Sequence, residues 1–167
     1  MHMLARTDQE KISRDEDFPA WVLDQAKALR LHKPRAIDWE ALADQLDDMY
    51  SQVKVDLGGD LRVILQHLLK LQFQPGDNEW KRRARGWKVS ATEHRNRVCS
   101  ILEDSRSLRK KLPEALARAY SGARKEAALQ MDLEERALPA KCPWTTEQVI
   151  DLDFFPERAP SSNGHRR

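Results

Sequence analysis

One basic stretch holds the residues best suited to bind a charged partner. Residues 80–97 read WKRRARGWKVSATEHRNR and contain seven Lys or Arg, one Glu and two Trp. Lysine and arginine neutralise phosphate or carboxylate charge, and tryptophan can stack on nucleobases. This composition is typical of nucleic-acid-binding segments, but it is equally typical of the solvated side of a helix.

Helical geometry separates the two tryptophans from most of these cations. A regular helix advances about 100° per residue, which puts Trp80 and Trp87 on the apolar side and predicts that both are core residues. The cations of the adjacent flank lie about 60° to 140° from Trp80. This basic stripe consists of Lys81, Arg85, Lys88 and Arg95. It predicts either a solvated cationic face or a surface for a phosphate backbone or an acidic protein.

Two histidines in predicted helices are further candidates. His67 lies in LQHLLKLQ, three residues before Lys70, so a titrating group and a cation share one helical turn. We include both among the candidate binding residues. His94 lies at the edge of an apolar stripe. Helix-face histidines are usually hydrogen-bonded core or boundary residues, and a functional one needs a carboxylate or carbonyl partner that fixes its tautomer.

One pattern is compatible with catalysis. RVILQH, from Arg62 to His67, fits the R-x(4–6)-H spacing of metal-independent all-α ribonucleases, in which Arg would stabilise the phosphate and His would move a proton. On a regular helix these residues are about 140° apart, which disfavours a shared target atom. There is no phosphate-binding glycine motif, E-x-x-H, H-x-x-x-H or C-x-x-C. We therefore expect no metal and no cofactor, can name no catalytic residue, and favour a non-enzymatic protein.

Composition indicates an all-α protein in a reducing compartment. Charged residues make up 34% of the chain and aromatic residues only 7%, which is typical of long solvated helices. The net charge is +2, so nucleic-acid binding would have to depend on local clustering. Cys99 and Cys142 form no disulfide framework. Without a signal-peptide pattern or an apolar run of about 20 residues, we expect a cytoplasmic protein that does not enter the membrane.

Apolar spacing and capping residues predict five helical segments. They cover residues 17–31, 38–74, 78–104 (capped by Asp77 or Asn78), 107–131 with a restart at Pro113, and 145–151 with a capping box between Thr145 and Gln148. We expect a flexible segment over 1–15, a single helical domain over 16–156 and a disordered tail over 157–167. The fold would be a helical bundle built on a long antiparallel helix pair with additional shorter helices.

The prediction of one long helix depends on the Gly58-Gly59 pair. Apolar residues keep steps of three and four through the glycines, at Leu42, Leu46, Met49, Val53, Leu57, Leu61, Ile64, Leu68 and Leu71. A hairpin at the glycines is the alternative. If the long helix pairs with the next one around residues 75–77, Lys81 lies near Lys70 and Arg85 near Gln66. The long helix then offers the basic stripe no acidic partner.

Several segments in order resemble a known bacterial family. They are DFPAWVLDQAKALR, RVILQHLLKLQFQP, LEDSRSLRKKLPEALARAYSGARKEAA and CPWTTEQVIDLDFFP. Together they resemble the family catalogued as domain of unknown function 29 over about Asp15 to Pro156. The resemblance implies a helical fold and supplies no activity. It implies that HLLK, from His67 to Lys70, and CPW, from Cys142 to Trp144, are the central and terminal signatures of the family.

These observations favour a non-enzymatic binding or protein-interaction module. Self-association into a homodimer, through apolar residues that the shorter helices leave uncovered, is one form of interaction that we consider. The alternative is an RNA- or DNA-binding protein that uses the basic helix 80–97, with a metal-independent ribonuclease as its extreme form.

Overall fold

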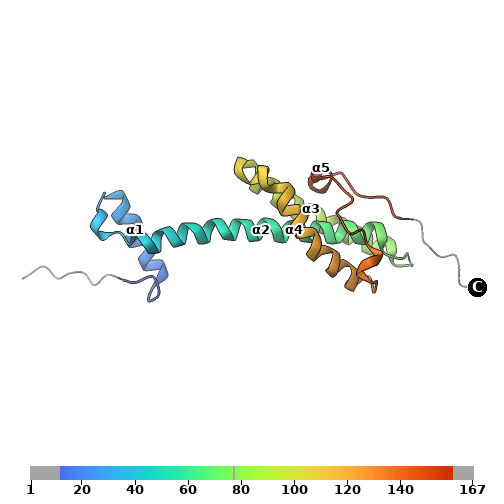
Figure 1. Ribbon diagram of the computed structural model, residues 1–167, viewed down its shortest axis with the longest axis horizontal. Coiled ribbons are helices and arrows are strands. Elements are labelled where there is room, and N and C mark those ends of the chain that lie inside the picture. The colour runs from blue at the N-terminus through green and yellow to red at the C-terminus, as the bar shows by residue number, and fades with distance from the viewer. Residues whose placement is uncertain (1–11, 77, 160–167) are drawn as a thin grey trace, which may run out of the picture. The chain divides into compact units, whose positions relative to one another are not determined.

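The computed structural model describes residues 12–76 and 78–159, and every described element is helical. The α-helices are α1 (Phe18–Arg30), α2 (Trp39–Phe73), α3 (Trp80–Glu103), α4 (Arg106–Gln130) and α5 (Thr146–Ile150), with 3-10 turns η1 (Pro34–Ala36) and η2 (Glu135–Ala137) (Figure 1). The all-α prediction is confirmed. The chain divides into two compact units, with the boundary between Gln52 and Val53. The single domain predicted over 16–156 remains a prediction.

The first unit contains α1, η1 and the beginning of α2. Asp17 caps α1 by accepting a hydrogen bond from the backbone N–H of Ala20, as its position before Pro19 predicts. Trp21 is 1% exposed and forms the centre of this small core. The buried Gln25 side chain accepts a hydrogen bond of 2.8 Å from the backbone N–H of Asp38, which joins α1 to the start of α2.

The prediction that α2 continues through Gly58 and Gly59 is confirmed. Both residues lie inside the helix, and no glycine of the described chain has a positive φ. The hairpin alternative is therefore wrong. The helix tolerates the two glycines because the apolar residues that follow them, from Leu61 to Leu71, are buried in the core of the second unit.

The second unit packs the remainder of α2 against α3, α4 and the C-terminal segment. Its core contains Leu68, Val98, Leu116 and Val149, one from each of the four α-helices. Pro113 lies inside α4 and does not restart it. The helix begins seven residues earlier, where the Ser105 side chain caps it. The proline therefore removes only one backbone donor from an otherwise continuous helix.

The C-terminal segment docks on this core largely as predicted. Thr145 and Gln148 form the predicted capping box of α5, and Trp144 and Phe154 pack on the core. Part of the predicted tail also makes contacts, because the backbone N–H of Ala159 donates a 2.8 Å hydrogen bond to Gln72 O. The rest of that tail (residues 160–167) and most of the predicted flexible segment (residues 1–11) lie outside the described residues.

The antiparallel pairing of α2 with α3 is confirmed in direction but not in register. The predicted register places Ala84 opposite His67, whereas the structure places Ser90 there, with 3.0 Å between His67 Nε2 and Ser90 Oγ. The difference arises because α3 begins at Trp80, so the connection is longer than the turn predicted around 75–77. The predicted cap by Asn78 is wrong, since Glu79 occupies the N-cap; Asp77 lies outside the described residues.

Candidate functional site

The prediction that both tryptophans of α3 are core residues is only partly confirmed, because both are half-buried and only Trp87 packs on the core. Trp87 packs against the core, and its ring meets the ring of Trp80 edge to face, with 5.6 Å between the centroids. Trp80 is half-buried and carries the guanidinium of Arg158 4.8 Å above its ring centroid. Neither ring is free to act as a base-stacking platform.

Three cations of the predicted basic stripe are exposed. Lys81, Arg85 and Lys88 all lie on the outer side of α3. The ammonium of Lys88 lies 5.0 Å above the ring centroid of Phe155. Among the residues that the structure describes, neither Lys81 nor Arg85 forms an ion pair. These side chains are therefore available to solvent.

The fourth member, Arg95, does not belong to that exposed surface. It is fully buried, its Nε donates a 2.8 Å hydrogen bond to Val149 O, and its guanidinium lies above the ring of Phe155. Burial lowers its pKa, and nearby Asp151 opposes that shift. Arg95 thus satisfies the last carbonyls of α5, as cations at helix C-termini commonly do. Its helical angle gave no warning, because Arg95 lies only about 20° from the exposed Lys88 around α3.

His67 and Lys70 point into the protein rather than outward. Lys70 is 7% exposed, donates a 2.9 Å hydrogen bond to Gln130 Oε1, and lies 5.0 Å from the ring centroid of Trp87. Burial lowers its pKa. Burial also lowers the pKa of His67 to about 4, with smaller contributions from the charges of Lys70 and His94. His67 is therefore neutral at pH 7, and the pair contributes to packing between α2, α3 and α4.

The structure gives His94 the carboxylate partner that sequence analysis required but could not identify. Its Nδ1 lies 2.6 Å from Asp60 Oδ1, and Arg97 Nε lies 3.3 Å from the same oxygen. Asp60 and His94 are mostly buried, with side-chain exposures of 12% and 19%. Sequence analysis missed Asp60 because no local signal links it to His94, and the predicted register places it opposite Ala91, one helical turn earlier on α3.

The Asp60–His94 pair lines a cavity of about 680 Å³ between α2 and α3, to which Arg62 and Ser100 also contribute. A carboxylate-oriented histidine can move protons. The residues of the ribonuclease pattern do not meet here, however. Arg62 lies 3.5 Å from Glu126 of α4, whereas His67 contacts Ser90 of α3. The structure therefore gives the Arg62–His67 pair no common target.

Comparison with known protein families identifies the family of this chain. Residues 14–155 match the model of a family described as a domain of unknown function, DUF29, so the chain belongs to this family. No curated protein and no solved structure matches the chain. The segment from Cys142 to Trp144 is structural here, because the Cys142 thiol donates to Trp144 O (3.4 Å) and Trp144 is buried.

Two further observations concern the described residues as a whole. They contain no cluster of three His, Cys, Asp or Glu side chains arranged to hold a metal ion. None of the helices in the described part of the chain is long and apolar enough to cross a membrane.

Proposed function

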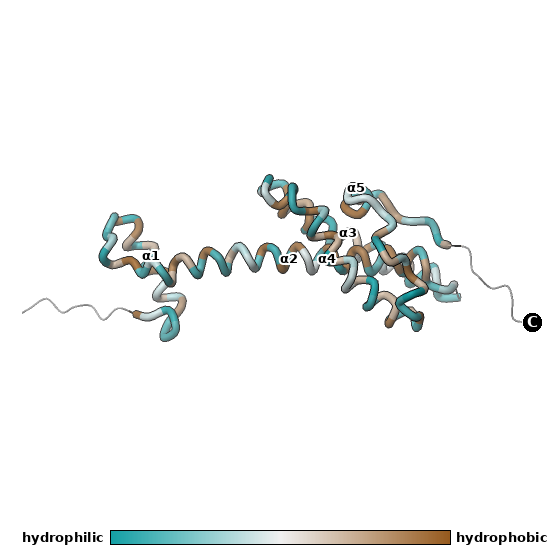
Figure 2. Tube along the Cα trace, in the orientation of Figure 1, coloured by the Kyte–Doolittle hydropathy of each residue, from teal (hydrophilic) through white to brown (hydrophobic). Residues whose placement is uncertain are grey.

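We propose that this protein is a non-enzymatic interaction module that self-associates through the beginning of α2. The observation that carries the proposal is an apolar seam formed by Trp39, Leu42, Leu46 and Met49. Trp39, Leu46 and Met49 are 59%, 60% and 58% exposed. Contiguous apolar surface of this kind is a common mark of protein interfaces. Figure 2 shows hydrophobic and hydrophilic residues alternating along this helix.

The spacing of the seam fits helix-to-helix pairing. Its residues follow one another by three, four and three positions, which is the a/d spacing of a coiled coil. The seam covers only two heptads, fewer than the three or four that sustain a strong coiled coil. We therefore expect a weak pair that dissociates on dilution.

The charges around the seam favour a second copy of the same helix as the partner. The residues that flank it are uncharged: Ala43, Gln45 and Tyr50. The acidic residues of this stretch lie about 120° or more from the centre of the seam: Glu40, Asp44, Asp47 and Asp48. A second copy would meet no like charge beside the seam, and a basic helix would find no carboxylate to pair with.

Sedimentation equilibrium of the full chain over a range of concentrations tests this proposal. We expect the average mass of the wild type to rise towards that of a dimer, and the double variant Leu46→Glu, Met49→Glu to remain a monomer. Ser51→Glu adds a carboxylate to the opposite side of the same helix and should behave as the wild type. A wild-type mass equal to one chain at every concentration would refute self-association, as would an unchanged dimer in the double variant.

Nucleic-acid binding is the second candidate, and the exposure of Lys81 and Arg85 without an ion pair among the described residues favours it. Binding of a labelled RNA or DNA oligonucleotide should weaken steeply with salt. The triple variant Lys81→Glu, Arg85→Glu, Lys88→Glu should abolish it. A charge-matched control replaces three exposed cations near α1, Lys27, Arg30 and Lys33, with Glu. Equal binding by both triple variants would eliminate this candidate, and recovery of shortened oligonucleotide would indicate ribonuclease activity.

A further inference from the structure

A groove of about 540 Å³ runs between α2 and α4 in the second unit. This volume is within the range of ligand-binding pockets, which cover roughly 300–1,000 Å³. Glycines from both helices line it, Gly58 and Gly59 from α2 and Gly122 from α4. Leucine, valine and alanine side chains make up most of the remaining floor, including Leu57 and Ala115. The floor of the groove is therefore apolar, and no side chains rise from it at the glycine positions.

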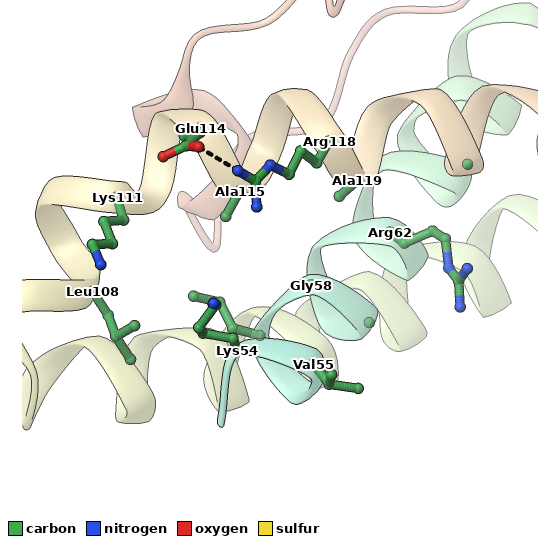
Figure 3. A pocket seen from close by; sticks show the side chains of 13 residues that line it. Lys54, Val55, Gly58, Arg62, Leu108, Lys111, Glu114, Ala115, Arg118 and Ala119 are labelled. Atoms are coloured by element: carbon green, nitrogen blue, oxygen red, sulfur yellow. Dashed lines mark hydrogen bonds and ion pairs between the residues drawn. The ribbon is translucent and has the colours of Figure 1, made fainter. Parts of the chain in front are cut away.

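Basic side chains come from both walls of this groove. Figure 3 shows Lys54 and Arg62 on α2, and Lys111 and Arg118 on α4. The single acidic lining residue is Glu114, which forms an ion pair with Arg118. Along each helix the two cations are seven or eight residues apart, a distance of about 10–12 Å. Arg62 in turn lies 3.5 Å from Glu126 of α4. The four cations therefore outnumber these two carboxylates, and the groove keeps a net positive charge over roughly two helical turns.

The internal packing of the protein does not account for Gly58 and Gly59. Each glycine inside a helix costs about 1 kcal/mol relative to alanine. A Cβ atom added at either position would meet no atom within 4 Å, and neither residue has a positive φ. By contrast, a Cβ atom at Gly122 would lie 3.1 Å from Arg62 Cδ. The two α2 glycines therefore keep open a part of the groove that the chain itself does not fill.

We infer that this groove docks an acidic amphipathic helix of a partner protein. The apolar floor matches the apolar side of such a helix, the glycines allow its backbone to approach closely, and the cations match acidic residues along both of its edges. A nucleic acid would place its charged backbone over an apolar floor that contains no aromatic residue. This surface belongs to a different unit from the apolar seam and does not depend on it.

Fluorescence anisotropy of the full chain with a labelled model peptide tests the inference. The probe has Leu and Ala at positions i, i+3, i+4 and i+7 and Glu between them. Gly59→Leu should abolish binding because its side chain fills the groove, and it should fold because the space is open. Lys111→Glu should weaken binding by about tenfold, or about 1.4 kcal/mol. Lys110→Glu makes the same change on an adjacent exposed residue that does not line the groove, and it should leave binding within twofold.

Controls distinguish docking from general attraction of anions. A peptide of the same composition in scrambled order should bind at least tenfold more weakly. Equal binding of both peptides, no binding of the ordered peptide, or unchanged binding in a folded Gly59→Leu variant would overturn the inference. If Gly59→Leu does not fold, equal effects of Lys111→Glu and Lys110→Glu would overturn it. An RNA oligonucleotide that displaces the ordered peptide from the groove and binds more tightly would assign the groove to nucleic acid instead.

Discussion

Asp60 and His94 join α2 to α3 through a contact of 2.6 Å between Asp60 Oδ1 and His94 Nδ1. Both side chains are mostly buried, so water competes weakly for this interaction. Arg97, on the next turn of α3, forms an ion pair with the same carboxylate oxygen. The three side chains join the two helices where Asp60 lies beside both His94 and Arg97.

The first prediction follows from that contact. Asp60→Asn should destabilise the protein by about 1–3 kcal/mol, because it leaves His94 and Arg97 beside a neutral group. Urea unfolding of Asp60→Asn, His94→Gln and the double variant measures the coupling between the two residues. We expect a coupling free energy of about 1 kcal/mol. Additive effects of the two substitutions would mean that the contact contributes nothing to stability.

The second prediction separates Arg95 from the exposed cations of the basic stripe. Arg95→Ala should lower the free energy of unfolding by about 3 kcal/mol, because it opens a cavity and leaves the carbonyl of Val149 without its donor. Lys81→Ala, on the exposed side of the same helix, should change it by less than about 0.5 kcal/mol. Chemical denaturation measures both, and similar values for the two variants would contradict the burial of Arg95.

The third prediction concerns pH. The pKa of His67 is about 4 in the folded protein, below the ordinary histidine value of 6.5. Between these values the unfolded chain binds a proton that the folded protein does not. The contribution of His67 to stability is therefore complete above pH 6.5 and decreases as the pH falls towards 4. We expect a loss of about 2 kcal/mol, less than full linkage because the side chain retains some contact with solvent.

His67→Gln provides the control for that prediction. Glutamine does not titrate and can still form a hydrogen bond with Ser90. Urea unfolding of this variant at pH 6.5, 5.5 and 4.5 should show a shallower decrease in stability than the wild type. Parallel pH profiles would mean that other groups, such as carboxylates, cause the acid sensitivity.

The fourth prediction uses the glycines of α2. Gly58→Ala and Gly59→Ala should each raise the free energy of unfolding by about 0.5–1 kcal/mol, since the helix gains propensity and the new methyl group meets no atom within 4 Å. Gly122→Ala should raise the free energy of unfolding by less, or lower it, because Arg62 Cδ would lie 3.1 Å from the new Cβ. Thermal unfolding of the three variants checks this order. Destabilisation by Gly59→Ala would show that the glycine serves the fold rather than an open groove.

The helices could be predicted from the sequence because their signals are local. Apolar steps of three and four residues identified α2, and Thr145 with Gln148 identified the start of α5. The register of α2 against α3 could not be predicted, since it depends on where α3 begins and on contacts such as His67 with Ser90. For the same reason the Asp60–His94 pair was not predicted.

The candidate site residues also divide into those that local signals predict and those that depend on distant contacts. Exposure of Lys81, Arg85 and Lys88 follows from the helical angle alone. Burial of Arg95 and Lys70 depends on partners far along the chain, Val149 and Gln130. The angular position of a residue around a helix cannot distinguish a cation at the edge of the solvated side from one that reaches a carbonyl on another element.

The contact between Arg95 and Val149 also has a consequence for biosynthesis. A guanidinium on α3 finds its acceptor 54 residues later in the chain, so during translation it stays without that acceptor until α5 has left the ribosome. The core around Val98 cannot close before then, since Val149 is part of it. Folding of the second unit must therefore finish after residue 149 has left the ribosome, and nascent chains stalled before that residue should remain sensitive to proteases.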